Sequence, residues 1–194
     1  MSEEWHRHPT LTGDRVRLEP LGTRHAEGLY RAGRDPGIWT WLASRQPASL
    51  ADTRAQIEHI LAQPDRLAWA QLDTRTGRVA GTTSYYRIDP VDRNLLIGHT
   101  WIGPPWQRTP LNTEAKLLLL RRAFEVLGAV RVAWETDIRN ERSQRAIERL
   151  GATREGVLRA HRIRTDGSLR DTVIYSVTAA EWPAVRDQLL SRWA

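Results

Sequence analysis

The sequence predicts a mixed α/β fold, in which helices flank one central, mostly antiparallel sheet of seven strands. Segments with strand-like alternation and segments with helical periodicity follow one another in the order β-α-α-β-β-β-α-β-α-β-β-α. Two turn signals, at residues 74–77 and 165–168, each join two strand-like segments directly. Direct connections of this kind make neighbouring strands antiparallel, which is why a mainly antiparallel sheet is expected.

The elements of the first half are marked by their periodicity. Polar and apolar residues alternate over 15–20, which predicts a strand with one buried face. Residues 23–33 and 49–62 have helical spacing, and Ile57 lies on the apolar face of the second helix. Three further strands are predicted to form an antiparallel meander, at residues 67–72, 78–88 and 95–102.

In the second half a long helix over 111–127 is predicted from its broad apolar stripe, with Gly128 at its C-terminal end. A short apolar strand is expected at 130–134, followed by a helix from Asn140 to Leu150. The last elements are a hairpin and a terminal helix, predicted at residues 157–164, 169–177 and 179–193. Without a linker or a repeat, the sequence predicts a single domain over 1–194, with its core at residues 12–180.

The composition excludes several classes of site. The chain has no cysteine, so a disulfide scaffold, a thiolate zinc site, an iron–sulfur cluster and a cysteine nucleophile are excluded. No His, Asp or Glu cluster has metal-ligand spacing, so no metal is expected. The N-terminus lacks the apolar run of a secretory signal, and no apolar stretch approaches the ~20 residues that span a bilayer. A cytoplasmic protein without a membrane partner is therefore expected.

The net charge of +6 comes almost wholly from arginine, because Lys116 is the only lysine. An arginine-rich surface favours an anionic partner, either nucleic acid or a small molecule that carries phosphate. A compositional preference for arginine over lysine explains the ratio equally well. No basic run or aromatic-interleaved stripe supports nucleic acid, which makes that partner the less favoured one.

The segment from Trp106 to Lys116 leads from a strand through a short loop into a buried helix. The start of a helix offers unpaired backbone amides and the positive end of the dipole, and it therefore binds phosphate readily. Thr109 is the predicted N-cap, with Pro110 at the first helical position, where a missing N–H costs nothing. An ordinary capped helix is the alternative interpretation of this segment.

The segment from Asp137 to Ala146 repeats this arrangement, since a strand again leads into a helix. Asn140 is the predicted cap and Ser143 lies one turn inside the helix. Taken alone, a cap asparagine and a first-turn serine more often have structural roles than functional ones.

Together the two segments resemble motifs A and B of the GCN5-related N-acetyltransferase (GNAT) superfamily, in its RimJ/RimL-like branch of ribosomal-protein N-terminal acetyltransferases. The resemblance covers nearly the whole chain. It rests on segments that keep the order and separation of the family, at residues 15–21, 97–102, 112–116, 139–143, 150–152, 155–159 and 166–171.

The resemblance implies a fold in which the fourth and fifth strands, 95–102 and 130–134, splay apart around acetyl-CoA. Backbone near Trp101 and Ile102 would pair with the pantetheine arm. The pyrophosphate would bind to the backbone amides of 107–113, and the residues implied there are Gln107, Arg108, Thr109, Leu111, Asn112 and Thr113. Asn140 would hydrogen-bond the pantetheine, Ser143 would lie near the sulfur, and Arg142 is a further candidate for the phosphates.

The chain departs from the family pattern at several positions. Arg108 and Pro110 stand where motif A normally has two glycines, and Leu96 stands where many relatives have a glutamate. Arg162 aligns with a carboxylate that other relatives are thought to use, and the family tyrosine that protonates the sulfur is absent from the second motif. Ser143 is the remaining candidate for that proton donor.

The general base has two candidates. His99 follows Ile97-Gly98 on a strand that would line the cleft, and a histidine has a suitable ordinary pKa. Glu135 ends the partner strand. A merely structural role is the more frequent one for each of them. Trp39 and Trp41 fall in the region that covers the acceptor in relatives, although aromatic packing between helices explains them as well.

The sequence thus predicts an acetyl-CoA-dependent N-acetyltransferase that transfers an acetyl group directly to a primary amine. The acceptor is a protein or peptide N-terminus or a small amine. The competing prediction is a catalytically weak CoA-binding or nucleic-acid-binding module of the same fold. The sequence leaves the oligomeric state open, with a homodimer among the options.

Overall fold

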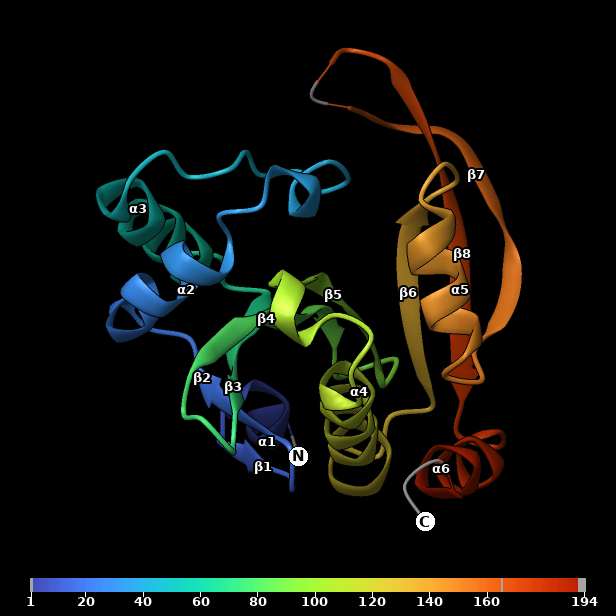
Figure 1. Cartoon of the computed structure of the whole chain (residues 1–194). Helices are drawn as coiled ribbons and strands as arrows, with labels where there is room; N and C mark the ends of the chain where they lie inside the picture. The colour runs from blue at the N-terminus through green and yellow to red at the C-terminus, as the bar shows by residue number, and fades with distance from the viewer. Residues whose placement is uncertain (1, 165, 192–194) are drawn as a thin grey trace. The chain divides into compact units, whose positions relative to one another are not determined.

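The computed structural model describes residues 2–164 and 166–191 (Figure 1). Thr165 of the predicted hairpin turn and residues 192–193 of the predicted last helix lie outside this part. The chain forms two compact units, Met1–Ile88 with Ile97–Leu119 and Asp89–Leu96 with Leu120–Ala194. Strand β5 (Asn94–Ile102) and helix α4 (Leu111–Arg121) each run from one unit into the other.

Unit 1 contains the N-terminal strands, which are hydrogen-bonded in the order β1-β2-β3-β4-β5. The pairs β1–β2, β2–β3 and β3–β4 are antiparallel. The strands that precede β5 are β1 (Leu11–Thr12), β2 (Val16–Pro20), β3 (Arg66–Asp73) and β4 (Val79–Asp89). The helical elements are α1 (Ser2–His6), η1 (Thr23–His25), α2 (Ala26–Ala32), η2 (Pro36–Ile38), α3 (Leu50–Leu61), η3 (Pro104–Trp106) and most of α4.

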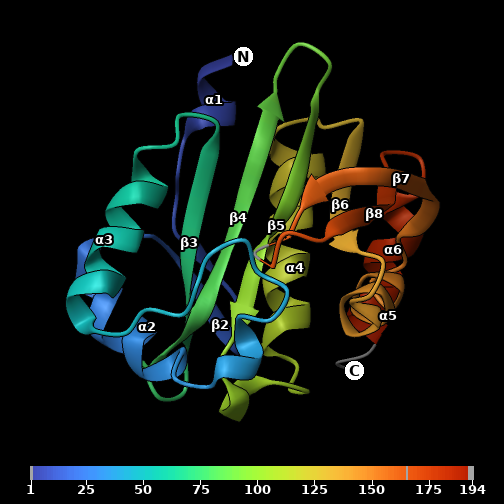
Figure 2. The ribbon, with the colours of Figure 1, turned by 90° about the horizontal axis from the view of Figure 1, so that it is seen from above.

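Helices α2 and α3 lie side by side next to β3 (Figure 2). Ser49 is the N-cap of α3, because its hydroxyl accepts a hydrogen bond from the amide of Asp52 at 3.1 Å. Ile57 on α3 and Leu29 on α2 pack with Ala68 and Ala70 of β3 in one buried apolar cluster. Their side chains are removed from water, and this burial holds the two helices on the sheet.

Unit 2 contains the beginning of β5 and the three strands that follow. Residues 94–96 of β5 pair in parallel with 131–133 of β6 (Arg131–Asp137). Strand β6 is antiparallel to β8 (Leu169–Thr178), which is antiparallel to β7 (Thr153–Ile163). The helical elements are the π-helical turn η4 (Arg122–Val126), α5 (Glu141–Glu148) and α6 (Trp182–Ser191).

The predicted order of elements is confirmed, apart from the unpredicted helix α1 and turns η2 and η3 and the following differences. An eighth strand, β1, is present, and two residues are too few to show a periodic pattern. The predicted helix over 111–127 is α-helical only to Arg121 and then continues as the π-helical turn. The last helix begins at Trp182, since Glu181 Oε2 accepts hydrogen bonds from the amide and hydroxyl of Thr178 and holds that segment in a turn.

Two further sequence expectations concern the whole chain. Within the part that the structure describes, no helix is long and apolar enough to cross a membrane. The same residues contain no group of His, Cys, Asp and Glu side chains that would hold a metal ion. The single-domain organisation stays a prediction.

Candidate active site

The loop between β5 and α4 is fixed by side-chain hydrogen bonds within unit 1. Trp106 Nε1 donates to Asp73 Oδ2 at 3.0 Å, and Gln107 Nε2 donates to the carbonyl of Ile102 at 2.8 Å. The Thr109 hydroxyl donates to the carbonyl of Trp106 at 2.7 Å. These contacts hold the loop without the two glycines that the family pattern has here.

Arg108 keeps the backbone conformation of a glycine. Its φ is +61°, in the left-handed region that L-residues rarely adopt, and its side chain is exposed. The backbone at this position therefore has the conformation that a glycine would adopt, and it carries an arginine side chain. A guanidinium at this place is a ready partner for a phosphate.

Helix α4 begins at Leu111, and the Glu114 amide donates to the carbonyl of Pro110 at 3.0 Å. The amides of the first turn have no acceptor inside a helix. Thr109 Oγ1, the predicted cap, accepts from the amide of Leu111 only at 3.4 Å, so capping is weak. Asn112 Oδ1 is buried and has no hydrogen-bond partner among the described residues. The first turn thus presents both anion-binding amides and a buried acceptor.

The three predicted site residues on β5 differ in exposure. His99 is exposed, has a φ of +47°, and packs edge-on against Tyr86 with ring centroids 4.9 Å apart. The carbonyl of His99 accepts a hydrogen bond from Thr82 Oγ1 at 3.3 Å. Trp101 and Ile102, by contrast, are half-buried. The left-handed residue interrupts the regular alternation of β5 just before the segment predicted to pair with pantetheine.

In unit 2 the predicted cap of α5 is confirmed. Asn140 Oδ1 accepts a hydrogen bond from the amide of Ser143 at 3.1 Å. This bond uses the carbonyl oxygen of the asparagine, and Nδ2 carries the donors that a ligand would use. Ser143 is half-buried on the first turn, and Arg142 beside it is exposed.

Glu135 lies on β6 and is held by an ion pair within unit 2. Arg162 donates to Glu135 Oε2 at 2.8 Å, and the Glu135 side chain is 6% exposed. Arg162, which aligns with a carboxylate of some relatives, therefore neutralises the nearby glutamate. Leu96, at the position of the other family glutamate, is paired with Ala133 in the parallel ladder.

The family model described as an acetyltransferase (GNAT) domain matches residues 15–153. The chain belongs to the GNAT acetyltransferase family. It is therefore an N-acetyltransferase, and the predicted family, mixed α/β fold and enzyme class are confirmed.

Solved structures agree with this assignment. A GCN5-related N-acetyltransferase from Brucella melitensis is 35% identical, with a TM-score of 0.94 over 97% of this chain and 86% of that one. A protein of T. thermophilus, provisionally assigned as an acetyltransferase, is 43% identical, with a TM-score of 0.88 over 97% and 99%. Mycobacterium smegmatis RimJ in complex with CoA-disulfide is 18% identical, with a TM-score of 0.82 over 97% and 96%, and it shares the fold.

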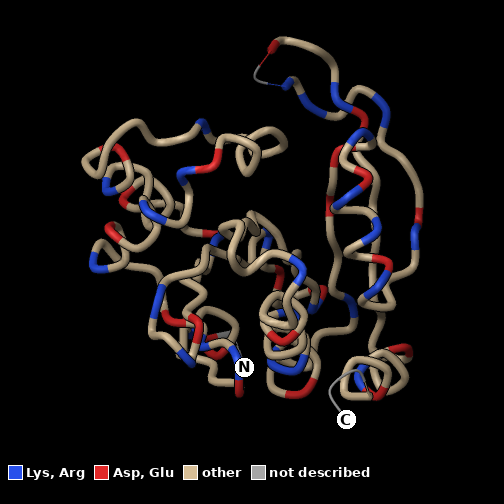
Figure 3. The backbone as a smooth tube through the Cα atoms, viewed as in Figure 1, with Lys and Arg blue, Asp and Glu red and all other residues tan. Residues whose placement is uncertain are grey.

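Many arginine side chains of this acetyltransferase form ion pairs with Asp or Glu. Arg164 donates to both carboxylate oxygens of Asp137, at 2.7 and 3.0 Å, and holds the pKa of that carboxyl below its usual range against the opposing effect of burial. Arg131 pairs with Glu155, and basic and acidic residues alternate along α5 (Figure 3). Interleaved charge of this kind differs from the continuous basic face that nucleic acid requires.

The sequence did not predict that two polar side chains of α4 are buried and hydrogen-bonded to the strands. The Glu114 carboxylate accepts hydrogen bonds from the backbone amides of Asp14, Arg15 and Val16, at 3.0, 2.7 and 2.8 Å. Lys116 is 4% exposed, and its Nζ donates to Thr83 Oγ1 at 2.8 Å and to Thr100 Oγ1 at 2.6 Å. Both side chains act inside unit 1 and tie α4 to the strands.

Proposed function

We propose that this acetyltransferase moves an acetyl group from acetyl-CoA directly to a primary amine, either a protein or peptide N-terminus or a small amine. In this reaction the amine nitrogen bonds to the acetyl carbon and the carbon–sulfur bond breaks. The amine loses one proton and the sulfur gains one. A chain without cysteine has no thiol to carry the acetyl group, which favours direct transfer.

The start of α4 carries the donor part of this proposal. The weakly capped first-turn amides, the exposed Arg108 and the buried Asn112 Oδ1 offer donors to phosphates and an acceptor to a ligand amide or hydroxyl. These groups match the chemistry of CoA, which has phosphates at one end and amides along its arm. We assign the phosphates to residues 107–113 of unit 1, with Arg142 as a further candidate, and the pantetheine to Trp101, Ile102 and Asn140.

The proposed proton transfers involve two side chains. Ser143 is the donor to the leaving sulfur, because its hydroxyl lies at the positive end of the α5 dipole, where developing negative charge is stabilised. His99 is preferred to Glu135 as the base. His99 is exposed, whereas the Glu135 side chain is 6% exposed and its Oε2 accepts a hydrogen bond from Arg162.

Acetyl-CoA binding tests the donor assignment. A ligand at about 100 times its Kd stabilises a protein by about 2.7 kcal/mol, so acetyl-CoA is expected to raise the Tm. Asn140→Asp keeps the oxygen that caps α5 but removes the Nδ2 donor. We therefore expect about tenfold weaker binding of acetyl-CoA, the equivalent of about 1.4 kcal/mol, and an unchanged Tm of the free protein.

Asn140→Ala is the matched comparison, because it removes both the cap and the donor. It is expected to weaken binding similarly and to lower stability by about 1 kcal/mol. Full acetyl-CoA affinity in Asn140→Asp would show that the asparagine does not bind the donor. A wild-type protein whose Tm does not respond to acetyl-CoA would contradict the proposed function itself.

The proton-transfer roles are tested by kcat in three variants. Ser143→Ala keeps the backbone amide bonded to Asn140, and we expect kcat to fall about tenfold or more with an unchanged Kd for acetyl-CoA. His99→Asn is chosen because asparagine tolerates the left-handed backbone at this position, and a similar fall is expected. Glu135→Gln should leave kcat within about twofold of wild type. A loss confined to Glu135→Gln would reverse the choice of base.

A further inference from the structure

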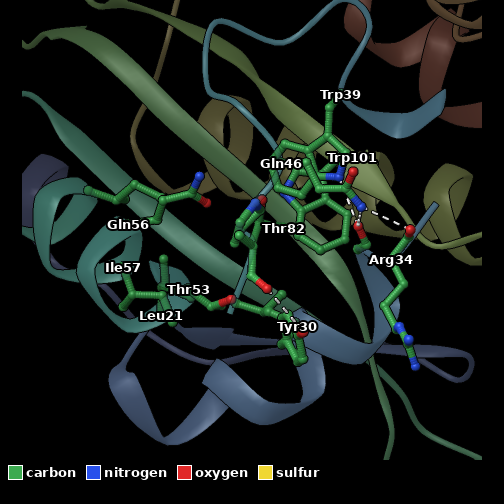
Figure 4. Close-up of a pocket in the computed structure, with 15 residues that line it drawn as sticks. Leu21, Tyr30, Arg34, Trp39, Gln46, Thr53, Gln56, Ile57, Thr82 and Trp101 are labelled. Carbon is green, nitrogen blue, oxygen red and sulfur yellow. Dashed lines mark hydrogen bonds between the residues drawn. The ribbon is translucent and has the colours of Figure 1, made fainter. Parts of the chain in front are cut away.

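Unit 1 contains a cavity of ≈ 390 Å³ between α2, α3 and the strands β4 and β5. Its size is that of a small-molecule site. The indole rings of Trp39 and Trp101 form one wall, with ring centroids 5.4 Å apart and a tilt of 43° (Figure 4). Gly33 makes room for them, since a Cβ there would lie 3.0 Å from Trp39 and 3.4 Å from Trp101.

Away from the two tryptophans, aliphatic side chains line the cavity beside Thr53 and Tyr30 (Figure 4). Ile57 of α3 and Leu29 of α2 line the cavity, and both belong to the buried apolar cluster of the unit. A flat apolar group in the cavity would thus contact indole rings and branched aliphatic side chains. Burial of apolar surface between such walls is favourable, and aromatic pairing adds to it.

The charge of the lining limits what the cavity accepts. Among the described residues that line it there is no Asp, Glu or Lys, and Arg34 is the one charged residue. Arg34 is exposed, and its guanidinium points away from the two tryptophans (Figure 4). The polar side chains are neutral, and the amide nitrogens of Gln46 and Gln56 already donate to the carbonyls of Arg34 and Arg45, at 2.8 and 2.7 Å. A second ammonium group of a polyamine would find no counter-charge here.

The cavity lies beside residues that the proposed reaction uses. Trp101 extends its ring into the cavity, and its backbone belongs to the segment assigned to the pantetheine. Thr82 also lines the cavity and donates to the carbonyl of His99, the proposed base. A ligand in the cavity is thus next to the part of β5 at which the acetyl group would be transferred.

We propose that this cavity holds the body of the acceptor, and that the acceptor is a primary amine with a single uncharged apolar group, an aromatic ring in the best case. This inference rests on the proposed function and adds the substrate class to it. The same chemistry occurs in a free arylalkylamine and in a peptide that begins with an aromatic residue. Trp41, by contrast, is 39% exposed and lies outside the cavity lining.

The test compares acceptors at saturating acetyl-CoA. We expect kcat/KM to be at least about tenfold higher for phenethylamine, or for a tetrapeptide beginning with phenylalanine, than for spermidine. The better of the two aromatic substrates identifies the source of the acceptor. An equal or higher kcat/KM for spermidine would overturn the inference.

Variants locate the effect in the cavity. Trp39→Ala is expected to lower kcat/KM for the aromatic acceptor about tenfold without changing the Kd of acetyl-CoA, whereas Trp41→Ala leaves both unchanged. Gln56→Glu adds a carboxylate to the cavity wall, which can pair with the second ammonium group of spermidine. The ratio of kcat/KM for spermidine to kcat/KM for phenethylamine is therefore expected to rise at least about fivefold, as for an exposed ion pair. Equal effects of the two tryptophan variants, or an unchanged preference in Gln56→Glu, would contradict the assignment.

Calorimetry separates this inference from the proposed function. Phenethylamine titrated into the protein without acetyl-CoA is expected to release or absorb heat in wild type and in Trp41→Ala, and to bind at least about tenfold more weakly to Trp39→Ala. If acetyl-CoA raises the Tm but phenethylamine does not bind, the substrate class is wrong and the donor assignment stands. If phenethylamine binds and acetyl-CoA does not raise the Tm, the donor assignment is wrong and the cavity still binds an aromatic amine.

Discussion

Glu114→Gln is expected to lower the free energy of unfolding by about 3 kcal/mol or more. The carboxylate accepts from three consecutive backbone amides, those of Asp14, Arg15 and Val16. A glutamine side chain has one oxygen in place of two. Its NH₂ group must therefore lie next to at least one backbone N–H, and two donors cannot form a hydrogen bond with each other. A buried amide that loses its acceptor costs about 1–3 kcal/mol, and the lost bonds to a charged group add to that cost. Urea-induced unfolding measures the difference.

Two comparisons show whether the loss comes from this contact. Glu27→Gln removes an exposed carboxylate from an i,i+4 pair with Arg31 and should change stability by less than about 0.5 kcal/mol. Gly13→Ala should also destabilise, since a Cβ would lie 2.6 Å from the Glu114 carboxyl carbon. A Glu114→Gln protein as stable as Glu27→Gln would mean that the three hydrogen bonds contribute little.

The elements of this fold were predictable because their signals are local. The helix α5 begins where Asn140 caps it, and the Asn140 oxygen accepts from Ser143, three residues away. Alternation over β2 and the turn signals before β4 and β8 likewise act over a few residues. Short windows of sequence contain all of this information.

The contacts of α4 were not predictable, because their partners are distant in the chain. Glu114 binds backbone amides about 100 residues away, and Lys116 binds hydroxyls 33 and 16 residues away. In the sequence both residues resemble the solvent-facing half of an amphipathic helix. Their burial is a property of the assembled sheet, as is the pairing of Trp39 with Trp101 in the cavity.

The backbone conformation of the loop before α4 was also not predictable from the residue types alone. Arg108 and Pro110 stand where the family pattern has two glycines, and glycine adopts positive φ without strain. Arg108 nevertheless has a φ of +61°, since hydrogen bonds of Trp106, Gln107 and Thr109 fix the loop on either side of it. A motif comparison compares residue types, whereas the conformation is decided by the contacts around them.

Lys116→Met is expected to raise the stability of the protein at pH 6 by about 2–4 kcal/mol. Burial lowers the pKa of Lys116 from its ordinary value of 10.5 to about 7, and the partners of its ammonium group among the described residues are two hydroxyls, which carry no counter-charge. At pH 6 the folded protein must therefore hold an ammonium group away from water. Methionine fills the same volume without a charge, and the hydroxyls of Thr83 and Thr100, 2.9 Å apart, remain bonded to each other.

The same lysine makes stability depend on pH with a definite sign. Between pH 7 and 10.5 the unfolded chain holds a proton on Lys116 that the folded chain lacks, so wild-type stability rises with pH in this window. The limiting slope is about 1.4 kcal/mol per pH unit, and below pH 7 the contribution of this group no longer changes. In Lys116→Met this contribution is absent, whereas every other titrating group is retained.

The measurement is therefore the difference between the two proteins, followed by urea-induced unfolding at pH 6, 8 and 10. The advantage of Lys116→Met is expected to be greatest at pH 6, smaller at pH 8 and smallest at pH 10, where little free energy is needed to keep the lysine neutral in the folded state. A difference independent of pH would show that the pKa of Lys116 is the same in the folded and the unfolded chain, as for a well-solvated ammonium group. A variant less stable than wild type at pH 6 would show that its hydrogen bonds to Thr83 and Thr100 outweigh the burial of the charge.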